Sequence, residues 1–335
     1  MQINVCIFGV SGYTGTQLIH FLAKHKYVNI VGVFGFESIG KKIKDLFPNL
    51  KTLPNITVSD YSDFNFDSVD LIFSCLPHGK FQSSIINNLN NNTSIIDLSG
   101  DFRLDDLSLY EEFYNIEHKS KDINSKFVYG LSEVYKKEIK KAKFVANPGC
   151  YPTSILLPLI PLIKKKIINN QHIIIDSKSG VSGTGKKLEI KNLFSEINEN
   201  FYSYGLKKHK HFVEIDQEIS KFGNNTFTFI PSLVPVTRGL QSTIYIEKTE
   251  SVTFYKNIIK DYYKNEPFIQ ILDKKCPTFS DVKYTNNLLL NIFEDYKKKR
   301  IIIISCIDNL VKGAAGQAIQ NMNLMYAFDE KESLV

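Results

Sequence analysis

The chain has 335 residues, of which 43% are hydrophobic and 23% are charged, and its formal net charge is +6. This length predicts two domains, and the composition is that of an ordinary globular protein. The lysines are scattered and lack the interleaved aromatic platform or long basic helix of a nucleic-acid binder, so we expect no nucleic-acid partner.

The elements expected in chain order are strands that alternate with helices, which predicts an α/β fold with a parallel sheet. In the first half we expect strands at 3–8, 29–34, 68–74 and 94–98, and a helix at 16–24. In the second half we expect strands at 172–176, 226–230, 240–246 and 300–306, and helices at 155–166, 254–264 and 314–327. The character of the sequence changes near residue 148, where we place the domain boundary.

The cysteines indicate free thiols. The five of them lie far apart and form no CxxC pair: Cys6, Cys75, Cys150, Cys276 and Cys306. This spacing argues against a zinc or dithiol site, and an odd number argues against a disulfide framework. The chain opens on a strand-like segment and has no apolar run of membrane length. We therefore expect a cytoplasmic protein with no metal and no membrane partner.

A glycine turn follows the first expected strand. Gly9, Gly12 and Gly15 have the G-x-x-G-x-x-G spacing between a strand and a helix, which is a dinucleotide-binding context. A tight turn without a ligand is the competing interpretation. After the second strand, Glu37 favours NAD, whereas Ser38 with the following lysines favours NADP, and the residues alone leave this choice open.

Cys150 is the candidate nucleophile. It follows Pro-Gly and precedes an apolar helix, so the N–H groups of the first turn can stabilise a thiolate and later an oxyanion. For the other four cysteines we predict buried structural roles.

The proton-transfer partner is expected in the segment that contains His209, His211 and Glu214. A carboxylate one helical turn after His211 can fix the tautomer of a histidine. A His-x-His-xx-Glu metal site is the competing functional interpretation. It is disfavoured because a catalytic metal needs three convergent ligands and the next obvious ligands are unconnected in sequence. An exposed helix start is the structural interpretation.

A glycine-rich loop follows the strand expected at 172–176. The stretch 180–186 fits G-x-x-x-x-G-K, which makes an ATP-dependent kinase the alternative from another class. Lys187 stands where that motif demands Ser or Thr, so a phosphate- or substrate-binding loop is preferred. Arg103 and Arg238 are candidates for bidentate contacts with a carboxylate or phosphate, or for structural ion pairs.

Nine motifs in this order resemble N-acetyl-γ-glutamyl-phosphate reductase of arginine biosynthesis, almost from end to end. They occupy residues 9–15, 76–79, 97–103, 129–133, 147–153, 179–183, 209–214, 234–239 and 309–318. The resemblance implies a Rossmann domain at 1–149, completed by a returning helix at 311–335. It also implies an α+β catalytic and oligomerisation domain of the glyceraldehyde-phosphate dehydrogenase type at 150–310.

The resemblance further implies an NADPH-dependent reduction of N-acetyl-L-glutamyl 5-phosphate to the 5-semialdehyde through a Cys150 thioester, in a homodimer or homotetramer. His209 is preferred over His211 as the acid. The implied cofactor residues are Gly9, Ser11, Gly12, Tyr13, Thr14, Gly15, Ser38, Pro77, Ser179, Gly180, Gly183 and Asn309. The implied substrate residues are Arg103, Asn147, Ser182, Tyr204 and Arg238. The closest rival is aspartate-semialdehyde dehydrogenase.

Overall fold

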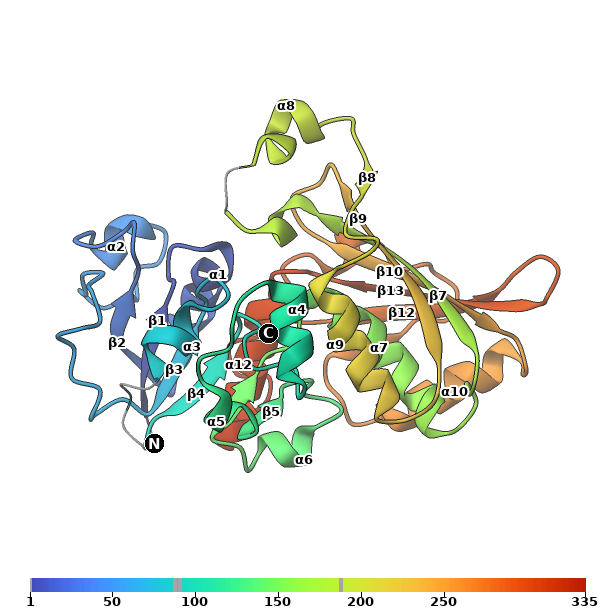
Figure 1. The fold of residues 1–335 in the computed structure, drawn as a ribbon, viewed down its shortest axis with the longest axis horizontal. Helices are drawn as coiled ribbons and strands as arrows, with labels where there is room; N and C mark the ends of the chain where they lie inside the picture. Colours follow the sequence, from blue (N-terminus) through green and yellow to red (C-terminus); the bar gives the residue numbers. More distant parts are fainter. Residues whose placement is uncertain (1, 87–88, 90–91, 187–188) are drawn as a thin grey trace. The chain divides into compact units, whose positions relative to one another are not determined.

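The fold is taken from a computed structural model that describes residues 2–86, 89, 92–186 and 189–335 (Figure 1). The chain forms two compact units. Unit 1 consists of Met1–Pro148 and Ala314–Val335, and unit 2 of Gly149–Gly313. The division thus falls at 148/149 and 313/314, whereas the sequence places it at 149/150 and 310/311. Lys187, on which the interpretation of the glycine-rich loop depends, lies outside the described residues.

Unit 1 is built on a parallel sheet of six strands. Its order is β2-β1-β3-β4-β6-β5, and every neighbouring pair is parallel. The strands are β1 (Ile3–Phe8), β2 (Val28–Phe34), β3 (Leu71–Ser74), β4 (Ser94–Asp97), β5 (Phe127–Tyr129) and β6 (Phe144–Ala146). Since β2 and β3 lie on opposite sides of β1, the strand order reverses at β1, and the carboxyl ends of β1 and β3 border the crevice where such sheets bind ligands.

The helices of unit 1 are short except for the first and the last. They are α1 (Tyr13–Leu22), α2 (Ile43–Leu46), α3 (Lys80–Ser84), α4 (Leu107–Tyr114), α5 (Lys121–Asn124), α6 (Lys136–Ile139) and α12 (Gly316–Met325). Helix α12 returns from the end of the chain and packs against α1, α6 and β4. A π-helical turn, Val311–Ala315, leads into it.

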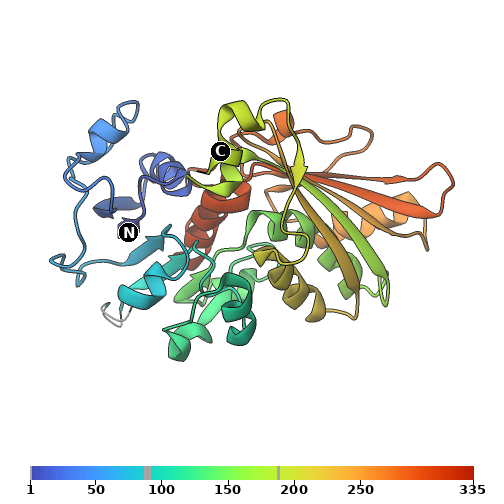
Figure 2. The same ribbon diagram turned by 45° about the horizontal axis from the view of Figure 1, so that its top comes forward.

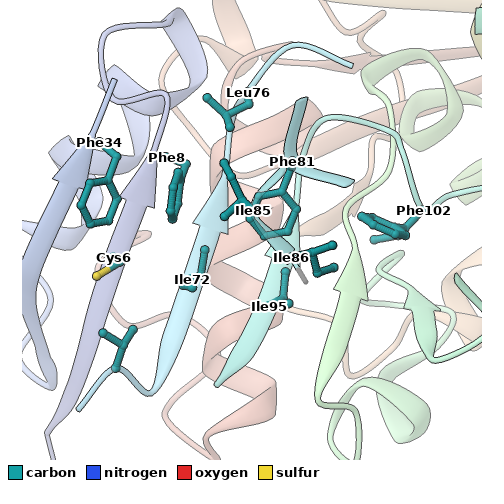
Figure 3. Packing of buried hydrophobic residues seen from close by; sticks show 12 residues of the cluster. Cys6, Phe8, Phe34, Ile72, Leu76, Phe81, Ile85, Ile86, Ile95 and Phe102 are labelled. Atoms are coloured by element: carbon teal, nitrogen blue, oxygen red, sulfur yellow. The ribbon is translucent and has the colours of Figure 1, made fainter. Parts of the chain in front are cut away.

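The core of unit 1 is an aromatic and aliphatic cluster on the sheet (Figure 3). The rings of Phe8 and Phe34 lie 4.6 Å apart between their centroids, and Phe81 and Leu76 pack beside them. These strands are buried on both faces, which explains their nearly continuous apolar sequences.

Unit 2 is built on a mixed sheet of seven strands, in the order β11-β12-β13-β10-β7-β9-β8. The strands are β7 (His172–Gly180), β8 (Tyr202–Ser203), β9 (Thr226–Val234), β10 (Leu240–Glu247), β11 (Ile269–Ile271), β12 (Leu288–Glu294) and β13 (Arg300–Ile307). Buried and partly exposed residues alternate along β7, β10 and β13, so the two faces of the sheet differ.

Helices cover one face of this sheet (Figure 2). Helix α7 (Cys150–Lys164) packs against β10 and β13 and is flanked by α9 (Lys210–Ser220) and α10 (Val252–Tyr262). The smaller elements are α8 (Phe194–Ile197), α11 (Phe279–Val282), and the 3-10 turns Val181–Thr184 and Ile190–Asn192. Helix α7 is apolar on all sides and buried almost throughout, as expected for a helix in a domain centre.

Two sequence expectations need correction. Cys276 is exposed, on the segment between β11 and α11, and is not a buried structural thiol. The helix expected at 155–166 begins at Cys150, because the proline at 152 is compatible with a first helical turn. Across the described part of the chain, no helix is long and apolar enough to span a membrane.

Candidate functional site

Cys150 is the first residue of α7, and its thiol is partly exposed. The preceding residue, Gly149, is the N-cap, and no side chain caps the helix, so the N–H groups of its first turn are available to a bound anion. A Cβ atom on Gly313 would lie 2.6 Å from the Cys150 Cβ, so the chain passes close to the nucleophile where unit 2 ends. This setting favours a thiolate that attacks an electrophilic carbon.

The His211 ring lies against Gly149, the residue that precedes the nucleophile. A Cβ atom on Gly149 would come within 2.4 Å of the His211 Nε2 atom, so only glycine fits between the ring and the chain at this position. The buried Glu214 carboxylate accepts a hydrogen bond of 2.8 Å from the Gly149 N–H. Glu214 therefore holds the backbone immediately before Cys150, a role the sequence did not suggest.

His209 caps α9 with its ring. Its Nδ1 atom accepts the His211 N–H at 3.1 Å, so the neutral ring carries its proton on Nε2. The rings of Tyr151, Tyr204 and Phe229 surround it at centroid distances of 5.6, 5.3 and 5.5 Å. This burial, together with the charge of the neighbouring lysine, lowers the pKa of His209 to about 4. At neutral pH His209 is thus a neutral N–H donor.

Two tyrosines extend the polar wall of the site. The Tyr204 hydroxyl donates to the Tyr151 hydroxyl at 3.2 Å, and Tyr151 donates to the Ser232 carbonyl oxygen at 3.2 Å. Burial raises the pKa of both tyrosines, so they remain protonated donors. Tyr151 also contacts the His211 ring, at a centroid distance of 5.7 Å. It therefore links the nucleophile's helix to both histidines.

The glycine-rich loop is fixed to two other segments of unit 2. Its Ser182 hydroxyl accepts a hydrogen bond of 2.9 Å from the Asn309 amide, and the Asn309 carbonyl oxygen accepts the Gly239 N–H. A Cβ atom on Gly180 would lie 2.8 Å from the backbone oxygens of residues 236 and 237. A Cβ atom on Gly183 would lie 2.9 Å from the Ser179 hydroxyl. These glycines serve close packing of the loop.

Arg238 is held at the edge of this loop. Its guanidinium pairs with the buried Asp308 carboxylate at 3.1 Å and lies over the Tyr284 ring at 4.7 Å. Asp308 also accepts the N–H groups of Tyr284 and Leu310. A guanidinium presents its N–H donors in a planar fork, a geometry that suits a carboxylate or a phosphate.

In unit 1 the glycine turn has the shape of a pyrophosphate cradle. Gly9 has a φ of 80°, and a Cβ atom there would lie 2.6 Å from the Cys75 carbonyl oxygen. A Cβ atom on Gly15 would lie 2.3 Å from the Gly9 oxygen. The N-cap of α1 is Gly12, and no side chain caps this helix, whose first turn contains Tyr13, Thr14 and Gly15. Ser11 precedes the cap, and Pro77 is exposed after β3, at the same edge of the sheet.

Two of the expected substrate residues make structural bonds in unit 1. The Arg103 guanidinium donates to the carbonyl oxygens of Asn147 and Leu98, at 2.7 and 3.1 Å. The Asn147 amide donates to the Ala314 carbonyl oxygen at 3.2 Å and accepts from Asn321. Both side chains therefore fix the segment that precedes the nucleophile.

The structure thus divides the expected residues between the units. Unit 2 brings together Cys150, Tyr204, His209, His211, Glu214 and the loop with Ser179, Ser182, Arg238 and Asn309, whereas Ser38, Pro77, Arg103, Asn147 and the glycine turn belong to unit 1. Sequence reasoning missed Tyr151, Gly149 and Asp308. The position of Gly149 next to the nucleophile was the one available signal, since glycine often marks a close approach.

The alternative interpretations find little structural support. Among the described ranges, no group of three or more His, Cys, Asp and Glu side chains is arranged to hold a metal ion. Within the glycine-rich stretch 180–186, residues Val181–Thr184 already form a 3-10 turn, whereas the glycines of a kinase-type phosphate loop form an open loop that precedes a helix.

Comparison with known proteins identifies both units. Residues 4–142 match the family described as semialdehyde dehydrogenase, NAD binding domain, and residues 150–309 match semialdehyde dehydrogenase, dimerisation domain. The crystal structure of aspartate semialdehyde dehydrogenase II from Vibrio cholerae, complexed with ASA, has a TM-score of 0.75 at 18% identity and covers 98% of this chain and 99% of its own. The Candida albicans aspartate semialdehyde dehydrogenase with NADP has a TM-score of 0.70 at 18% identity, over 98% and 99%. At this identity they establish the fold, a Rossmann-type domain joined to a mixed-sheet domain.

Sequence relatives give the finer assignment. The probable chloroplastic N-acetyl-gamma-glutamyl-phosphate reductase of Arabidopsis thaliana is 42% identical over 100% of this chain and 84% of its own length. The N-acetyl-gamma-glutamyl-phosphate reductase of Campylobacter jejuni is 43% identical over 100% and 98%. The chain therefore belongs to the semialdehyde dehydrogenases and, among them, to the N-acetyl-gamma-glutamyl-phosphate reductase family.

Proposed function

We propose that the chain catalyses the reductive dephosphorylation of N-acetyl-L-glutamyl 5-phosphate to N-acetyl-L-glutamate 5-semialdehyde, a step of arginine biosynthesis. The observation that carries the proposal is the placement of Cys150 at the uncapped start of α7 with the His211 ring against the preceding residue. An acyl phosphate is a substrate that a thiolate can attack directly, because phosphate is a good leaving group.

The glycine turn of unit 1 fits a nicotinamide dinucleotide. The space beside Gly9 and Gly15 leaves no room for side chains, and the start of α1 offers uncapped N–H groups to a pyrophosphate. A bound NADPH or NADH supplies the hydride. The residues that would hold it in unit 1 are Gly9, Ser11, Gly12, Tyr13, Thr14 and Gly15 in the turn, with Ser38 and Pro77. We also assign Ser179, Gly180, Gly183 and Asn309 of unit 2 to the cofactor.

Cys150 performs the covalent step. Its sulfur forms a bond to the acyl carbon as the bond from that carbon to the phosphate oxygen breaks, and inorganic phosphate leaves. The N–H groups at the start of α7 stabilise the negative charge on the carbonyl oxygen during this attack. After reduction, the alkoxide oxygen reforms its double bond to carbon as the carbon–sulfur bond breaks, which releases the aldehyde and the Cys150 thiolate. Cys150 then regains its proton.

The two histidines have different tasks. His211 is the group that takes and returns the proton, because its Nε2 atom touches Gly149. His209 stays neutral with its proton on Nε2, and this N–H donates to the oxygen on which charge develops. This assignment reverses the order of preference from the sequence, where His209 ranked first. Glu214 positions Cys150 through the Gly149 N–H.

The polar groups around the loop bind the substrate. Arg238, held by Asp308, takes a carboxylate or phosphate, and the hydroxyls of Ser182 and Tyr204 provide further polar contacts to the substrate. Arg103 and Asn147 support substrate binding only indirectly, because their side chains fix the backbone that precedes the nucleophile.

We also propose a cytoplasmic homodimer that forms through the open sheet face of unit 2. Opposite residues of four neighbouring strands, Ile174, Tyr245, Ile302 and Phe293, form a partly exposed row away from the helices. Such an apolar row suits burial against a second copy. Replacing Ile302 by Glu should yield monomers in analytical ultracentrifugation, and an unchanged sedimentation coefficient would count against this face.

The reverse reaction tests the proposed activity. N-acetylglutamate semialdehyde and phosphate are supplied with NADP or NAD, and the nicotinamide absorbance is followed. Phosphate-dependent reduction is expected with the wild type and not with Cys150→Ser. Turnover with aspartate semialdehyde alone would assign the chain to the neighbouring activity, and no turnover with either aldehyde would refute the proposal.

A further inference from the structure

Tyr284 has a backbone conformation that a bulky residue rarely adopts. Its φ is 64°, in the left-handed region, and among the described residues other than glycine that have a positive φ it is the only aromatic one. It stands two positions after the end of α11, where a chain that leaves a helix commonly carries glycine. The residue is 70% exposed, so burial of the ring does not compensate for the strain. A tyrosine at this position therefore needs another explanation.

The backbone of Tyr284 is fixed from two directions. Next to it in the chain, the N–H and the hydroxyl of Thr285 both donate to the Val282 carbonyl oxygen, at 3.1 and 2.9 Å. The Tyr284 N–H itself donates to the buried Asp308 carboxylate at 2.8 Å. These bonds hold the chain in the left-handed turn whatever side chain residue 284 carries.

The exposed ring lies over the guanidinium of Arg238. The Arg238 Cζ atom is 4.7 Å from the centroid of the Tyr284 ring, which is within the range of a cation–π contact. The Asp308 oxygen that accepts the Tyr284 N–H, Oδ2, also accepts the Arg238 guanidinium at 3.1 Å. The other oxygen of Asp308 accepts the N–H groups of Leu310 and Val311. One fixed carboxylate thus holds both the guanidinium and the backbone that carries the ring.

The same segment also fixes the backbone beside Arg238. Gly239 has a φ of 117°, and a Cβ atom there would lie 2.4 Å from the Phe279 Cγ atom. The Gly239 N–H donates to the side-chain oxygen of Asn309 at 2.9 Å. Residues 279–284 therefore hold Arg238 at both ends, its backbone through Phe279 and its guanidinium through Tyr284.

We propose that Tyr284 is a positioning residue that sets the plane of the Arg238 guanidinium for the anionic group of the substrate. A carboxylate or a phosphate forms two parallel hydrogen bonds with a guanidinium only at an edge of its plane. A ring stacked on one face, together with Asp308 at one nitrogen, restricts rotation of that plane. The inference rests on the proposed function, because there Arg238 binds the substrate, and it adds a residue that acts through Arg238.

Binding of two anions to the full chain tests the inference. The dissociation constants of inorganic phosphate and of N-acetyl-L-glutamate, a carboxylate analogue of the substrate, are measured by isothermal titration calorimetry. Tyr284→Leu removes the aromatic face and should raise at least one of the two constants by about fivefold. The constant that rises identifies the group that Arg238 takes. Tyr284→Phe keeps the face and should leave both constants unchanged, and so should the control Tyr296→Leu at a fully exposed tyrosine.

Tyr284→Gly separates positioning from folding. Glycine adopts a positive φ without strain, so the midpoint of thermal unfolding should stay within about 2 °C of the wild-type value or rise. Anion binding should nevertheless weaken by about fivefold, as in Tyr284→Leu. In the reverse reaction both variants should raise the KM of the corresponding substrate, while kcat stays within about twofold of the wild-type value. A merely structural role would instead lower the unfolding midpoint and kcat together.

Two results would overturn the inference alone. One is wild-type binding of both anions by Tyr284→Leu and Tyr284→Gly. The other is equally weak binding by Tyr284→Phe and Tyr284→Leu, since the hydroxyl and not the ring face would then be responsible. In both cases turnover of the wild type in the reverse reaction would leave the proposed function standing.

The proposed function can also fail separately. The expected changes in binding without any turnover of the wild type would refute the proposed activity and support the role of Tyr284. If Arg238→Met left both dissociation constants unchanged, Arg238 would not be the anion site. Its role in the proposed function and the inference would then fail together.

Discussion

The ring of His209 provides a test of the site that does not depend on substrate. Its pKa falls from the ordinary 6.5 to about 4 in the folded chain because burial disfavours the charged ring. Between these two values the unfolded chain binds a proton that the folded chain does not. Stability is therefore fully present above pH 6.5 and is lost as the pH falls toward 4.

The magnitude follows from the size of the shift. One unit of pKa corresponds to about 1.4 kcal/mol, so the whole shift would contribute about 3 kcal/mol to the free energy of unfolding. Since the ring remains partly exposed, we expect about 2 kcal/mol. His209→Asn isolates this contribution, because asparagine is also a favoured N-cap and preserves the start of α9.

Urea unfolding followed by circular dichroism at pH 7 and pH 4.5 measures the effect. The wild type should lose about 2 kcal/mol more of its unfolding free energy than His209→Asn over this interval. The remaining residues are the same in both proteins, so their contributions cancel in the comparison. Equal losses in the two proteins would refute the argument that the folded chain keeps this ring neutral.

Three further substitutions probe how the site is held. Gly149→Ala places a Cβ atom 2.4 Å from the His211 Nε2 atom. It should lower the free energy of unfolding in urea by about 1–3 kcal/mol and abolish turnover. Normal activity would contradict the close approach. Glu214→Gln weakens a charge-assisted bond to the Gly149 N–H, so kcat should fall with little change in KM, and a change in KM alone would argue against positioning of the nucleophile. Asp308→Asn leaves the Arg238 guanidinium without its buried partner and should destabilise the chain by about 3 kcal/mol, whereas the double variant with Arg238→Met should recover part of this loss in thermal unfolding.

Much of the fold follows from local pattern. The limits of β1 agree with the sequence expectation, and long apolar runs predict β7, β10 and β13 to within a few residues of their ends. The short strands β5 and β6 were missed, because three apolar residues between polar turns carry too little periodicity. Strand β12 was also missed, since its mostly apolar sequence at 288–293, interrupted by Asn291, is equally compatible with a buried helix.

The candidate site was less predictable, because its contacts join distant parts of the chain. The Glu214 carboxylate reaches the N–H of a residue 65 positions earlier, and Asp308 pairs with a guanidinium 70 positions earlier. Sequence spacing relates Glu214 only to its neighbours on α9, which is why it suggested a bond to a histidine. Tyr151 could not be distinguished in sequence from the apolar residues that follow it on α7.

The same long-range contacts explain why the nucleophile stands where it does. A helix start supplies N–H donors to any anion, but it does not fix the direction in which its first side chain points. Here Glu214 holds the N–H before Cys150, the His211 ring occupies the space beside Gly149, and Gly313 closes on the Cys150 Cβ. All of these groups belong to unit 2. The orientation of the thiol is therefore set by the packing of a single unit, and its reactivity depends on that packing as much as on the helix start itself.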